Sequence, residues 1–374
     1  MQAGVEMSLD MSVTAPSPPW RPLSFSALAE WPVVDPTPAF LAFARSAPAL
    51  VKPDAASAAA PLRPAAEAAL RAPAKDGAEA RRFFERFFRP WRREGAQTGF
   101  LTGYYEPELP ASRTRSAAFS APLYRAPADL LRLSPDAPLP DGLKEAQGFA
   151  RVDTDTGRLS PYPDRAAIEA GFLEGRGLEL VFLADPVEAF FVHVQGSARL
   201  RLPDGETMRV GYAAKNGHRF TAIGRVLVNE GELPLEGADM AGIRRWLAAH
   251  PERAAGLMRR NRSFIFFREI EGAEAEAGPI GAQGVALTPL ASLAVDAVLT
   301  PYGTPILVDA PTLPVEGAPF HRLVVAQDTG SAITGPERGD LFTGSGEAAG
   351  ALAGTIRHPA RWTVLRPAGE EAGR

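Results

Sequence analysis

The sequence predicts a mainly β protein with a few helices. Short apolar runs bounded by Gly, Pro, Asn and Asp recur at irregular spacing, and such runs are typical of strands. Only a few segments carry apolar residues at the helical spacing of three and four positions. Because the strands do not alternate regularly with helices, the pattern favours this class over repeated βαβ units.

The composition is that of an ordinary globular protein. The 374 residues are 45% hydrophobic and 22% charged, with a net charge of −4, and this length is typical of about two domains. No long Lys/Arg run occurs, so nucleic acid is not an expected partner. The chain has no cysteine and five scattered histidines, so neither disulfides, nor thiol catalysis, nor a metal site is expected.

The N-terminal part, residues 1–73, is rich in Ala and Pro, and we expect roughly the first 20 residues to be disordered. Met1–Trp20 has neither the basic start nor the apolar core of a secretory signal. No apolar run approaches the ~20 residues that span a bilayer. Taken literally, the sequence describes a soluble chain that is not exported.

Two helices are expected in the first hundred residues. Pro38–Ala47 is a candidate short helix with proline in its first turn. The stronger candidate follows Asp76, which forms an N-capping pair with Glu79, and it ends at Pro90. Four phenylalanines recur in it at helical spacing, and we interpret this stripe as core packing: Phe83, Phe84, Phe87 and Phe88.

Most of the remaining chain is expected to form strands, with a Pro-rich segment over 107–140 and an Ala/Glu/Gly linker over 272–281. A helix is expected to begin near Asp164, and two amphipathic helices cover 241–249 and 253–260. The expected strands are 98–105, 178–184, 189–194, the hairpin 198–202 with 208–212, 263–267, 305–308, 322–326 and 362–365.

The segment 323–354 combines an apolar strand, two aspartates and many glycines. The strand Leu323–Ala326 runs directly into Asp328, and Asp340 lies among the glycines that follow. Glycines allow a ligand to approach the backbone closely, and a carboxylate at the end of a strand suits a catalytic acid. The alternative is a tight surface turn in which both aspartates cap backbone amides. The length and glycine density of the segment favour the functional interpretation.

A second interpretation comes from the triplet Asp-Thr-Gly, which begins at Asp328 and again at Asp155. In pepsin-like aspartic proteases two such carboxylates share a proton. Each of those loops follows an apolar strand, whereas Asp155 lies in the polar stretch RVDTDTGRLS. The protease is therefore the less favoured alternative.

Several motifs occur together in one order along the chain. The segments around Asp296, Asp328 and Asp340 are similar to a three-aspartate ("3D") barrel domain. Upstream of them lie TGYYEP (102–107), YPDR (162–165), VQGS (194–197), GYAAKNG (211–217) and NRSFIFF (261–267). Together, from about 98 to 365, they resemble the membrane-bound lytic murein transglycosylase A family. Family members carry an export signal, often with a lipid-modified cysteine, and this chain shows neither.

The resemblance implies two β-domains. Residues 74–104 and 272–368 would form a double-psi β-barrel (3D) domain, and residues 105–271 a second β-domain inserted into it, with a glycan groove between them. The implied activity is that of a lytic transglycosylase, which cleaves the β-1,4 bond between N-acetylmuramic acid and N-acetylglucosamine and leaves 1,6-anhydromuramoyl ends. No metal or organic cofactor is implied.

The implied partner is the glycan strand of peptidoglycan, which is acted on by a monomer; association with other cell-wall enzymes stays open. A substrate outside the cytoplasmic membrane implies a periplasmic or outer-membrane-associated enzyme. The true start of the protein would then lie upstream of Met1.

By motif, the resemblance makes Asp340 the catalytic residue and Asp328 its neighbour. One carboxyl group of raised pKa suffices: it protonates the leaving oxygen, and the resulting carboxylate then takes the proton of the C6 hydroxyl that closes on C1. Asp328 either supports catalysis electrostatically or orders its loop. Asp296 is expected to cap a turn.

Substrate-binding candidates come from the upstream motifs. Each candidate tyrosine is either a platform for a sugar ring or a half-buried core residue: Tyr104, Tyr105, Tyr162 and Tyr212. The polar candidates around the sugar are Gln195, Gly196, Ser197, Lys215 and Asn216. His193 and His218 stay unassigned, because single histidines in strands are usually structural. A non-catalytic glycan-binding protein and an ordinary hydrolase are the alternatives to the transglycosylase.

Overall fold

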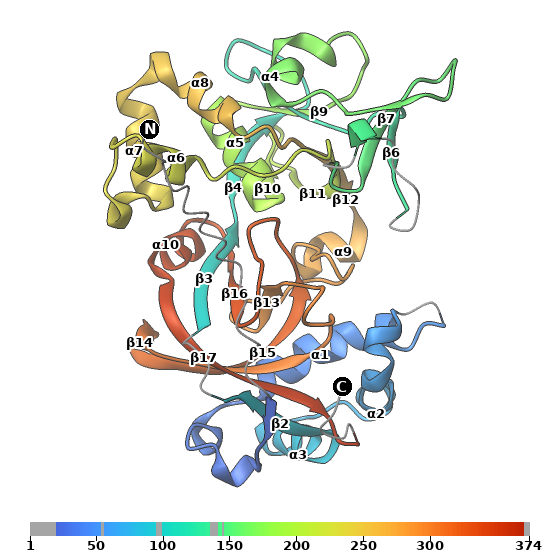
Figure 1. The fold of residues 1–374 in the computed structure, drawn as a ribbon, viewed down its shortest axis with the longest axis vertical. Coiled ribbons are helices and arrows are strands. Elements are labelled where there is room, and N and C mark those ends of the chain that lie inside the picture. Colours follow the sequence, from blue (N-terminus) through green and yellow to red (C-terminus); the bar gives the residue numbers. More distant parts are fainter. Residues whose placement is uncertain (1–19, 54–55, 95–98, 135–140, 144–145, 370–374) are drawn as a thin grey trace, which may run out of the picture.

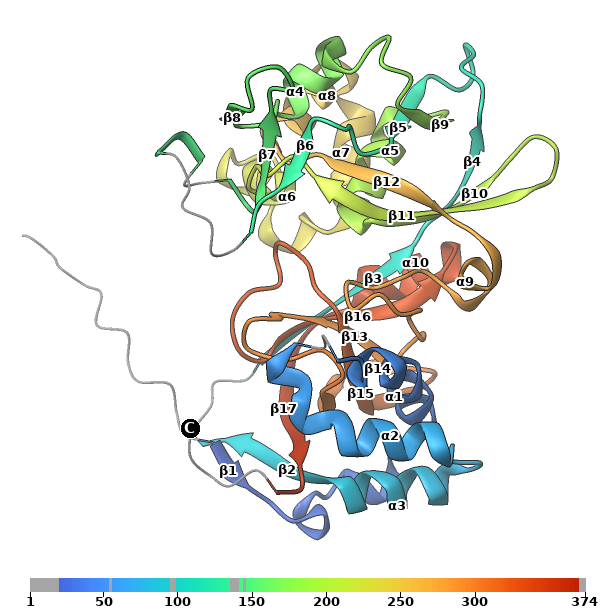
Figure 2. The same cartoon turned by 90° about the vertical axis from the view of Figure 1, so that its right-hand side faces the viewer.

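The structure, a computed structural model, describes residues 20–53, 56–94, 99–134, 141–143 and 146–369. The first 19 residues, for most of which we expect disorder, lie outside these ranges. Two β-rich bodies lie one above the other (Figures 1 and 2). Strand β3 (Gly99–Glu106) belongs to the lower body and leads directly into β4 (Glu108–Ser112) of the upper body.

The lower body is a closed six-stranded β-barrel. Its strand order is β17-β14-β15-β13-β16-β3, and β3 closes the ring by pairing with β17. The pairs β3–β16 and β13–β15 are parallel, so long connections rather than hairpins must join them. The strands after β3 are β13 (Ser292–Val295), β14 (Pro305–Val315), β15 (Ala318–Asp328), β16 (Arg338–Ser345) and β17 (Arg357–Pro367).

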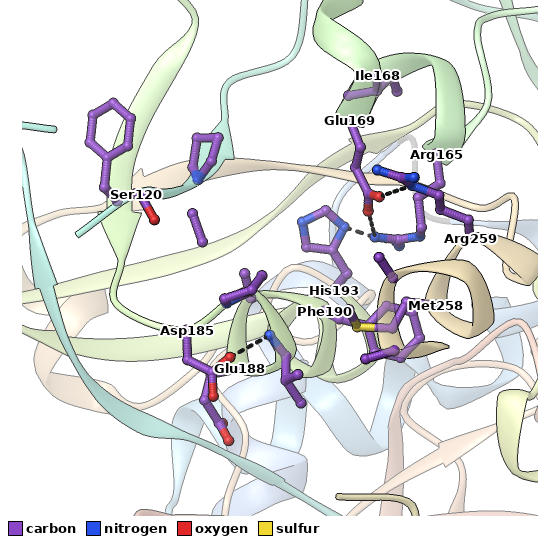
Figure 3. Close-up of a pocket in the computed structure, with 18 of the residues that line it drawn as sticks. Ser120, Arg165, Ile168, Glu169, Asp185, Glu188, Phe190, His193, Met258 and Arg259 are labelled. Carbon is purple, nitrogen blue, oxygen red and sulfur yellow. Dashed lines mark hydrogen bonds and ion pairs between the residues drawn. The ribbon is translucent and has the colours of Figure 1, made fainter. Parts of the chain in front are cut away.

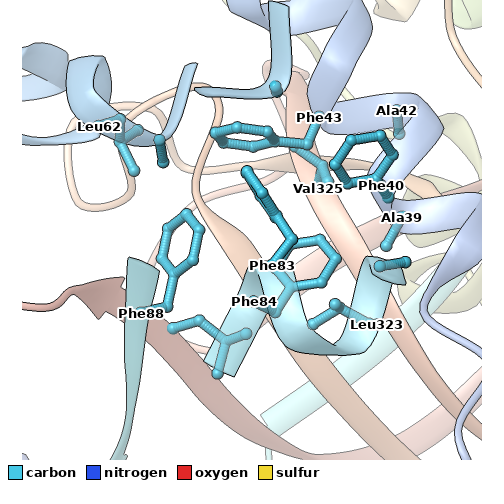
Figure 4. Packing of buried hydrophobic residues seen from close by; sticks show 14 of the residues in the cluster. Ala39, Phe40, Ala42, Phe43, Leu62, Phe83, Phe84, Phe88, Leu323 and Val325 are labelled. Atoms are coloured by element: carbon cyan, nitrogen blue, oxygen red, sulfur yellow. The ribbon is translucent and has the colours of Figure 1, made fainter. Parts of the chain in front are cut away.

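Helices from the N-terminal part cover one face of the barrel. They are α1 (Thr37–Leu50), α2 (Arg63–Arg71) and α3 (Gly77–Phe87), and β1 (Trp20–Pro22) and β2 (Phe88–Arg93) extend the sheet beside β17. Figure 4 shows the phenylalanines of α1 and α3 packed together over Leu323 and Val325 of β15. The prediction that the phenylalanine stripe is core packing is confirmed.

Both expected helices of the first hundred residues are present. The side chain of Asp76 accepts a hydrogen bond from the Glu79 amide at 2.8 Å, which satisfies one of the free amides at the start of α3. The helix ends at Phe87, so Phe88 lies in β2 and joins the core from a strand.

The upper body contains a six-stranded sheet of order β12-β11-β10-β4-β9-β5 and a small sheet of order β6-β7-β8. In the sequence, barrel strands both precede and follow the residues of this body. The predicted class, a barrel with a second β-domain inserted into it, is therefore confirmed. The strands are β5 (Ala121–Tyr124), β6 (Leu130–Arg132), β7 (Phe149–Val152), β8 (Leu159–Ser160), β9 (Glu179–Leu183), β10 (Ser197–Arg201), β11 (Thr207–Lys215) and β12 (Ile265–Ile270). Its helices are α4 (Arg165–Ala167), α5 (Pro186–Gln195), α6 (Ile223–Asn229), α7 (Met240–Ala249) and α8 (Pro251–Arg260).

One expected strand, 189–194, is wrong, because these residues belong to helix α5. The helix is buried along much of its length, and an unbroken apolar run cannot distinguish a buried helix from a buried strand. The residues at the two ends of this segment indicate a helix more clearly. Asp185 caps the helix by accepting from the Val187 amide, Pro186 starts it, and Gly196 ends it at φ 79°.

The glycine-rich segment is also not one long loop. Asp340 lies within strand β16, and residues Glu347–Thr355 form helix α10. Several glycines permit close packing rather than ligand approach. A Cβ at Gly339 would lie 2.5 Å from the Trp362 ring, and one at Gly350 would lie 2.8 Å from the Tyr105 ring. The expected linker likewise contains the short helix α9 (Gly272–Ala277).

A buried ion pair joins the two bodies. Glu106, at the end of β3, is fully buried, and its carboxylate accepts from Arg209 of β11 at 2.8 and 3.0 Å. The hydroxyl of Ser345, at the end of β16, donates to the same carboxylate. The strand that carries the candidate catalytic region is thereby fixed to the upper sheet.

Candidate active site

Asp328 and Asp340 lie at one level of the barrel sheet. Both are paired in register with Ala294 of β13, Asp328 from β15 and Asp340 from β16. Residues directly opposite one another across a sheet point to the same face. Because strands lie about 4.8 Å apart, the two aspartates are about 10 Å apart along the sheet, with one strand between them.

Asp340 is half-buried and has a single hydrogen-bond partner in the part of the chain that the structure describes. The Thr102 hydroxyl donates to its Oδ1 at 2.6 Å, across the register pair that joins β3 and β16. Burial raises the pKa of Asp340 to about 6, and the nearby charge of Asp328 adds to the rise, whereas Thr102 and the Arg338 cation oppose it. Near neutral pH this side chain can hold or release a proton, and no described residue forms a hydrogen bond with its Oδ2.

Asp328 has the same type of side chain but no free oxygen. The Tyr104 hydroxyl donates to Oδ2 at 2.7 Å, and the amides of Ala282 and Thr329 both donate to Oδ1 at 2.9 Å. Burial raises the pKa of Asp328, and the three hydrogen bonds oppose that rise. The pKa of Tyr104 is raised by burial and by Asp328, so the phenol keeps its proton and donates it.

Three residues near the aspartates were not among the sequence candidates: Thr102, Tyr302 and Arg338. Thr102 lies two positions before Tyr104 in the TGYYEP motif, and the period of a strand places both on one face, so the signal was available. Tyr302 lies on the loop between β13 and β14, where burial and the Asp328 charge raise its pKa to about 12. Nothing in the local sequence of Tyr302 indicates this position.

The VQGS motif joins the two bodies. The side-chain oxygen of Gln195 accepts a hydrogen bond from the Tyr105 amide at 3.3 Å. Gly196 ends helix α5, and Ser197 begins β10. Tyr105 lies on the opposite face of β3 from Tyr104 and packs against Gly350, so these residues support the strand that carries Thr102 and Tyr104.

Two substrate-binding candidates are buried, which contradicts their expected role. Tyr162 is 1% exposed, and its ring meets Phe172 and Phe266 edge to face, so neither ring face can stack on a sugar. Asn216 is also 1% exposed, and its Nδ2 donates to the carbonyls of Pro163 and Arg262 at 3.0 Å. Both residues hold loops of the upper body together.

Tyr212 and Lys215 remain accessible. Tyr212 is 43% exposed on β11. The half-buried Lys215 ammonium donates to Gln147 Oε1 at 2.8 Å, and burial lowers its pKa. Asp296 accepts from the amides of Val298 and Gly335, as expected for a residue that caps a turn. Asp155 lies in the exposed turn between β7 and β8 in the upper body, whereas Asp328 lies in the barrel, so the two Asp-Thr-Gly triplets belong to different sheets.

Within the described residues, no helix is long and apolar enough to cross a membrane. Across those same residues, no group of three or more His, Asp and Glu side chains is placed to hold a metal ion.

Comparisons with known proteins cover both bodies. Residues 100–268 match the MltA specific insert domain, and residues 291–366 match the 3D domain. Membrane-bound lytic murein transglycosylase A of Escherichia coli strain K12 is 34% identical over 288 residues, which cover 74% of this chain and 69% of that protein. The chain belongs to the membrane-bound lytic murein transglycosylase A family. It is a peptidoglycan lytic transglycosylase, as the sequence resemblance predicts.

Solved structures of this transglycosylase family share the fold. The enzyme from Agrobacterium tumefaciens has a TM-score of 0.85 at 42% identity, covering 93% of this chain and 98% of that one. MltA from Neisseria gonorrhoeae in its monoclinic form has a TM-score of 0.78 at 32% identity, covering 94% and 93%. Escherichia coli MltA with bound chitohexaose has a TM-score of 0.63 at 30% identity, covering 88% and 90%.

Proposed function

We propose that this enzyme cleaves the β-1,4 bond between N-acetylmuramic acid and N-acetylglucosamine and leaves 1,6-anhydromuramoyl ends, with Asp340 as the acid and then the base. The observation that carries this proposal is the state of Asp340. Its pKa is raised to about 6, and only one of its carboxyl oxygens has a partner among the described residues. A general acid needs both a proton near working pH and an oxygen that reaches the substrate.

The two proton transfers use one side chain. Protonated Asp340 gives its proton to the glycosidic oxygen as the C1–O bond breaks and positive charge develops at C1. The Asp340 carboxylate then takes the proton of the muramoyl C6 hydroxyl, whose oxygen bonds to C1 and closes the anhydro ring. The acid form is thereby restored, and no water is consumed.

Asp328 acts from a fixed position. Its three hydrogen bonds hold the carboxylate two strands away from Asp340, with β13 between them, and its negative charge raises the pKa of Asp340. The same charge favours the positive charge that develops on the sugar. Asp328 is therefore an electrostatic support whose own oxygens do not exchange protons with the substrate.

We propose that the glycan lies between the two bodies, where the accessible candidates of the upper sheet, Tyr212 and Lys215, complete the site. Tyr104 lines the barrel side beside Asp328. Tyr105, on the opposite face of β3, and the Gln195–Ser197 motif hold the strand that carries it. The chitohexaose bound to the Escherichia coli relative supports a glycan ligand. We further propose a monomer that acts in the periplasm at the outer membrane, in keeping with the names of the membrane-bound relatives.

Product analysis tests the reaction. After digestion of purified sacculi, mass spectrometry should find muramoyl ends lacking one water relative to reducing ends, because the C6 hydroxyl replaces water as the nucleophile. Reducing ends would show that the enzyme is a hydrolase, and intact glycan would show a binding protein. Either result contradicts the proposal.

The pH profile tests the acid. Because the free enzyme must hold the Asp340 proton, kcat/KM should be level below pH about 6 and should fall about tenfold per pH unit above it. Initial rates on soluble glycan strands between pH 4.5 and 8.5 measure this. A profile that rises through pH 6 would mean that the ionised form starts the reaction, and the assignment would fail.

Thr102→Val gives a matched test of the same group. Valine keeps the shape of threonine but removes the hydroxyl that stabilises the ionised Asp340 carboxylate. We expect the falling limb of the pH profile to move to higher pH. If the falling limb stays at the same pH, then that limb does not report the titration of Asp340.

A further inference from the structure

A cavity of about 860 Å³ lies wholly within the upper body, apart from the two aspartates. It is bounded by β5, β9 and the helices α4, α5, α7 and α8, and every residue that lines it lies between Arg115 and Phe264. Its volume is in the range of small-molecule sites. The reaction proposed above uses none of its residues.

One end of the cavity carries excess positive charge. Arg165 is 2% exposed, and its guanidinium donates to the carbonyls of Asn261 and Ser263 at 2.9 and 2.7 Å. Arg165 and Arg259 share one carboxylate, that of Glu169, at 3.5 and 2.8 Å. Two cations and one anion leave this end with one net positive charge.

A neutral imidazole lies beside that end. His193 is 7% exposed, and its Nδ1 accepts from Arg165 Nη2 at 3.3 Å. The hydrogen of the ring is therefore on Nε2, for which the described residues offer no acceptor. Burial and the Arg165 charge lower the pKa of His193 well below its usual value. Figure 3 shows the second ring nitrogen of His193 turned away from Arg165. A ligand oxygen would satisfy this donor.

The opposite end carries excess negative charge. Figure 3 shows Asp185 and Glu188 on the far side of His193 from Glu169 and Arg259. Arg244 forms an ion pair with Glu188. Among the described residues, the hydrogen-bond donor to the Asp185 carboxylate is the Val187 amide, at 2.7 Å. Two anions and one cation leave one net negative charge. The remaining charged lining residues, Arg115, Glu174 and Glu179, lie around Tyr124 and together carry one further net negative charge.

The wall between the two ends is apolar and made largely of small residues. Phe190 and Met258 are buried there, and Ala189 and Ala254 also line the cavity. We propose that the cavity binds a short zwitterionic peptide with small side chains. Its carboxylate meets His193 and the Arg165–Arg259 end, and its ammonium meets the Asp185–Glu188 end. The source of this peptide rests on the proposed function, because the short peptides of peptidoglycan carry free amino and carboxylate groups.

One helix connects the cavity to the candidate active site. Helix α5 lines the cavity from Pro186 to His193 and ends at Gln195, which accepts from the Tyr105 amide of β3. Its ten residues span about 15 Å. A peptide of four or five extended residues spans the same length.

Calorimetric titration of the full chain with tri-alanine tests the proposal. We expect saturable binding at one site, and at least about tenfold weaker binding of N-acetyl tri-alanine amide, which lacks both charges. Arg259→Gln should weaken tri-alanine at least about tenfold, the loss of one charge-assisted hydrogen bond. Arg260→Gln is the matched control, since Arg260 lies on the same helix in an exposed ion pair with Glu230 but does not line the cavity. It should bind as the unchanged chain does.

Three results would overturn the proposal: no saturable binding at millimolar tri-alanine, equal binding of the blocked peptide, or equal loss in both arginine variants. His193→Gln, which keeps a neutral donor, should bind more tightly than His193→Ala. Comparable melting temperatures for these variants show that binding rather than folding has changed.

The cavity proposal and the proposed reaction can fail independently of each other. Asp340→Asn should bind tri-alanine normally, so a chain that forms anhydro ends but ignores tri-alanine refutes the cavity proposal alone. A chain that binds tri-alanine but forms no anhydro ends refutes the reaction alone. A raised KM of Arg259→Gln on peptide-bearing strands but not on peptide-free glycan identifies the attached peptide as the ligand, and an unchanged KM on both identifies a free peptide.

Discussion

Asp340→Asn is expected to lower kcat/KM on peptidoglycan by a factor of about 10³–10⁴ or more. The asparagine keeps the size and polarity of the side chain but can neither donate the proton nor recover it, and each transfer alone contributes roughly 10²–10⁴-fold. Glycan affinity should persist, because the binding residues are untouched. Turnover of soluble glycan strands and a separate pull-down on sacculi measure the two properties.

The same variant should be the more stable protein at pH 7.5. Burial raises the folded pKa of Asp340 above its ordinary value, to about 6, so the fold loses stability as pH rises from about 4 through about 6. Asparagine removes that loss, and the melting temperature should exceed that of the unchanged chain at pH 7.5 but not at pH 4.

Asp328→Asn provides the matched comparison at the neighbouring carboxylate. It should cost less activity, since the proton transfers remain at Asp340, and part of its effect should come from the loop that it orders through Ala282 and Thr329. If Asp328→Asn is folded and inactive while Asp340→Asn keeps more than about a tenth of the activity, the two roles must be exchanged.

Arg209→Met is expected to lower the free energy of unfolding by about 3–5 kcal/mol, the usual result of removing one partner of a buried ion pair. Glu106 is fully buried, so its carboxylate cannot turn to water when the guanidinium that donates twice to it is removed. Urea unfolding followed by tryptophan fluorescence measures the change.

Arg199→Met is the control for this effect. Arg199 lies on the neighbouring strand β10, and its contact with Glu108 is 3.6 Å long and exposed, so its loss should cost no more than about 1 kcal/mol. Equal losses in the two variants would mean that the Glu106–Arg209 pair does not hold the bodies together. Activity should also fall in Arg209→Met, because Glu106 of this pair is the last residue of β3, the strand that holds Thr102 and Tyr104.

Local signals in the sequence were sufficient for much of the fold. The Asp76 cap and the phenylalanine spacing predict helix α3, and the Pro203-Asp204-Gly205 turn predicts the β10–β11 hairpin. These features depend on residues within a few positions of one another, so they can be predicted directly from the sequence. The order of the motifs likewise indicates Asp340 and Asp328 before any geometry is known.

The tertiary structure was needed wherever contacts come from distant segments. Tyr162 and Asn216 resemble substrate-binding residues in their motifs. Tyr162 is instead packed against Phe266, about a hundred positions away. The Asn216 amide donates to the carbonyl of Arg262, about fifty positions away. The state of Asp340 is of the same kind. Its pKa depends on how much water is excluded by strands β3, β13 and β16 together, and on a carboxylate held two strands away. Dehydration and Coulomb energy depend on distance in space, and neighbouring letters of a sequence do not contain that distance.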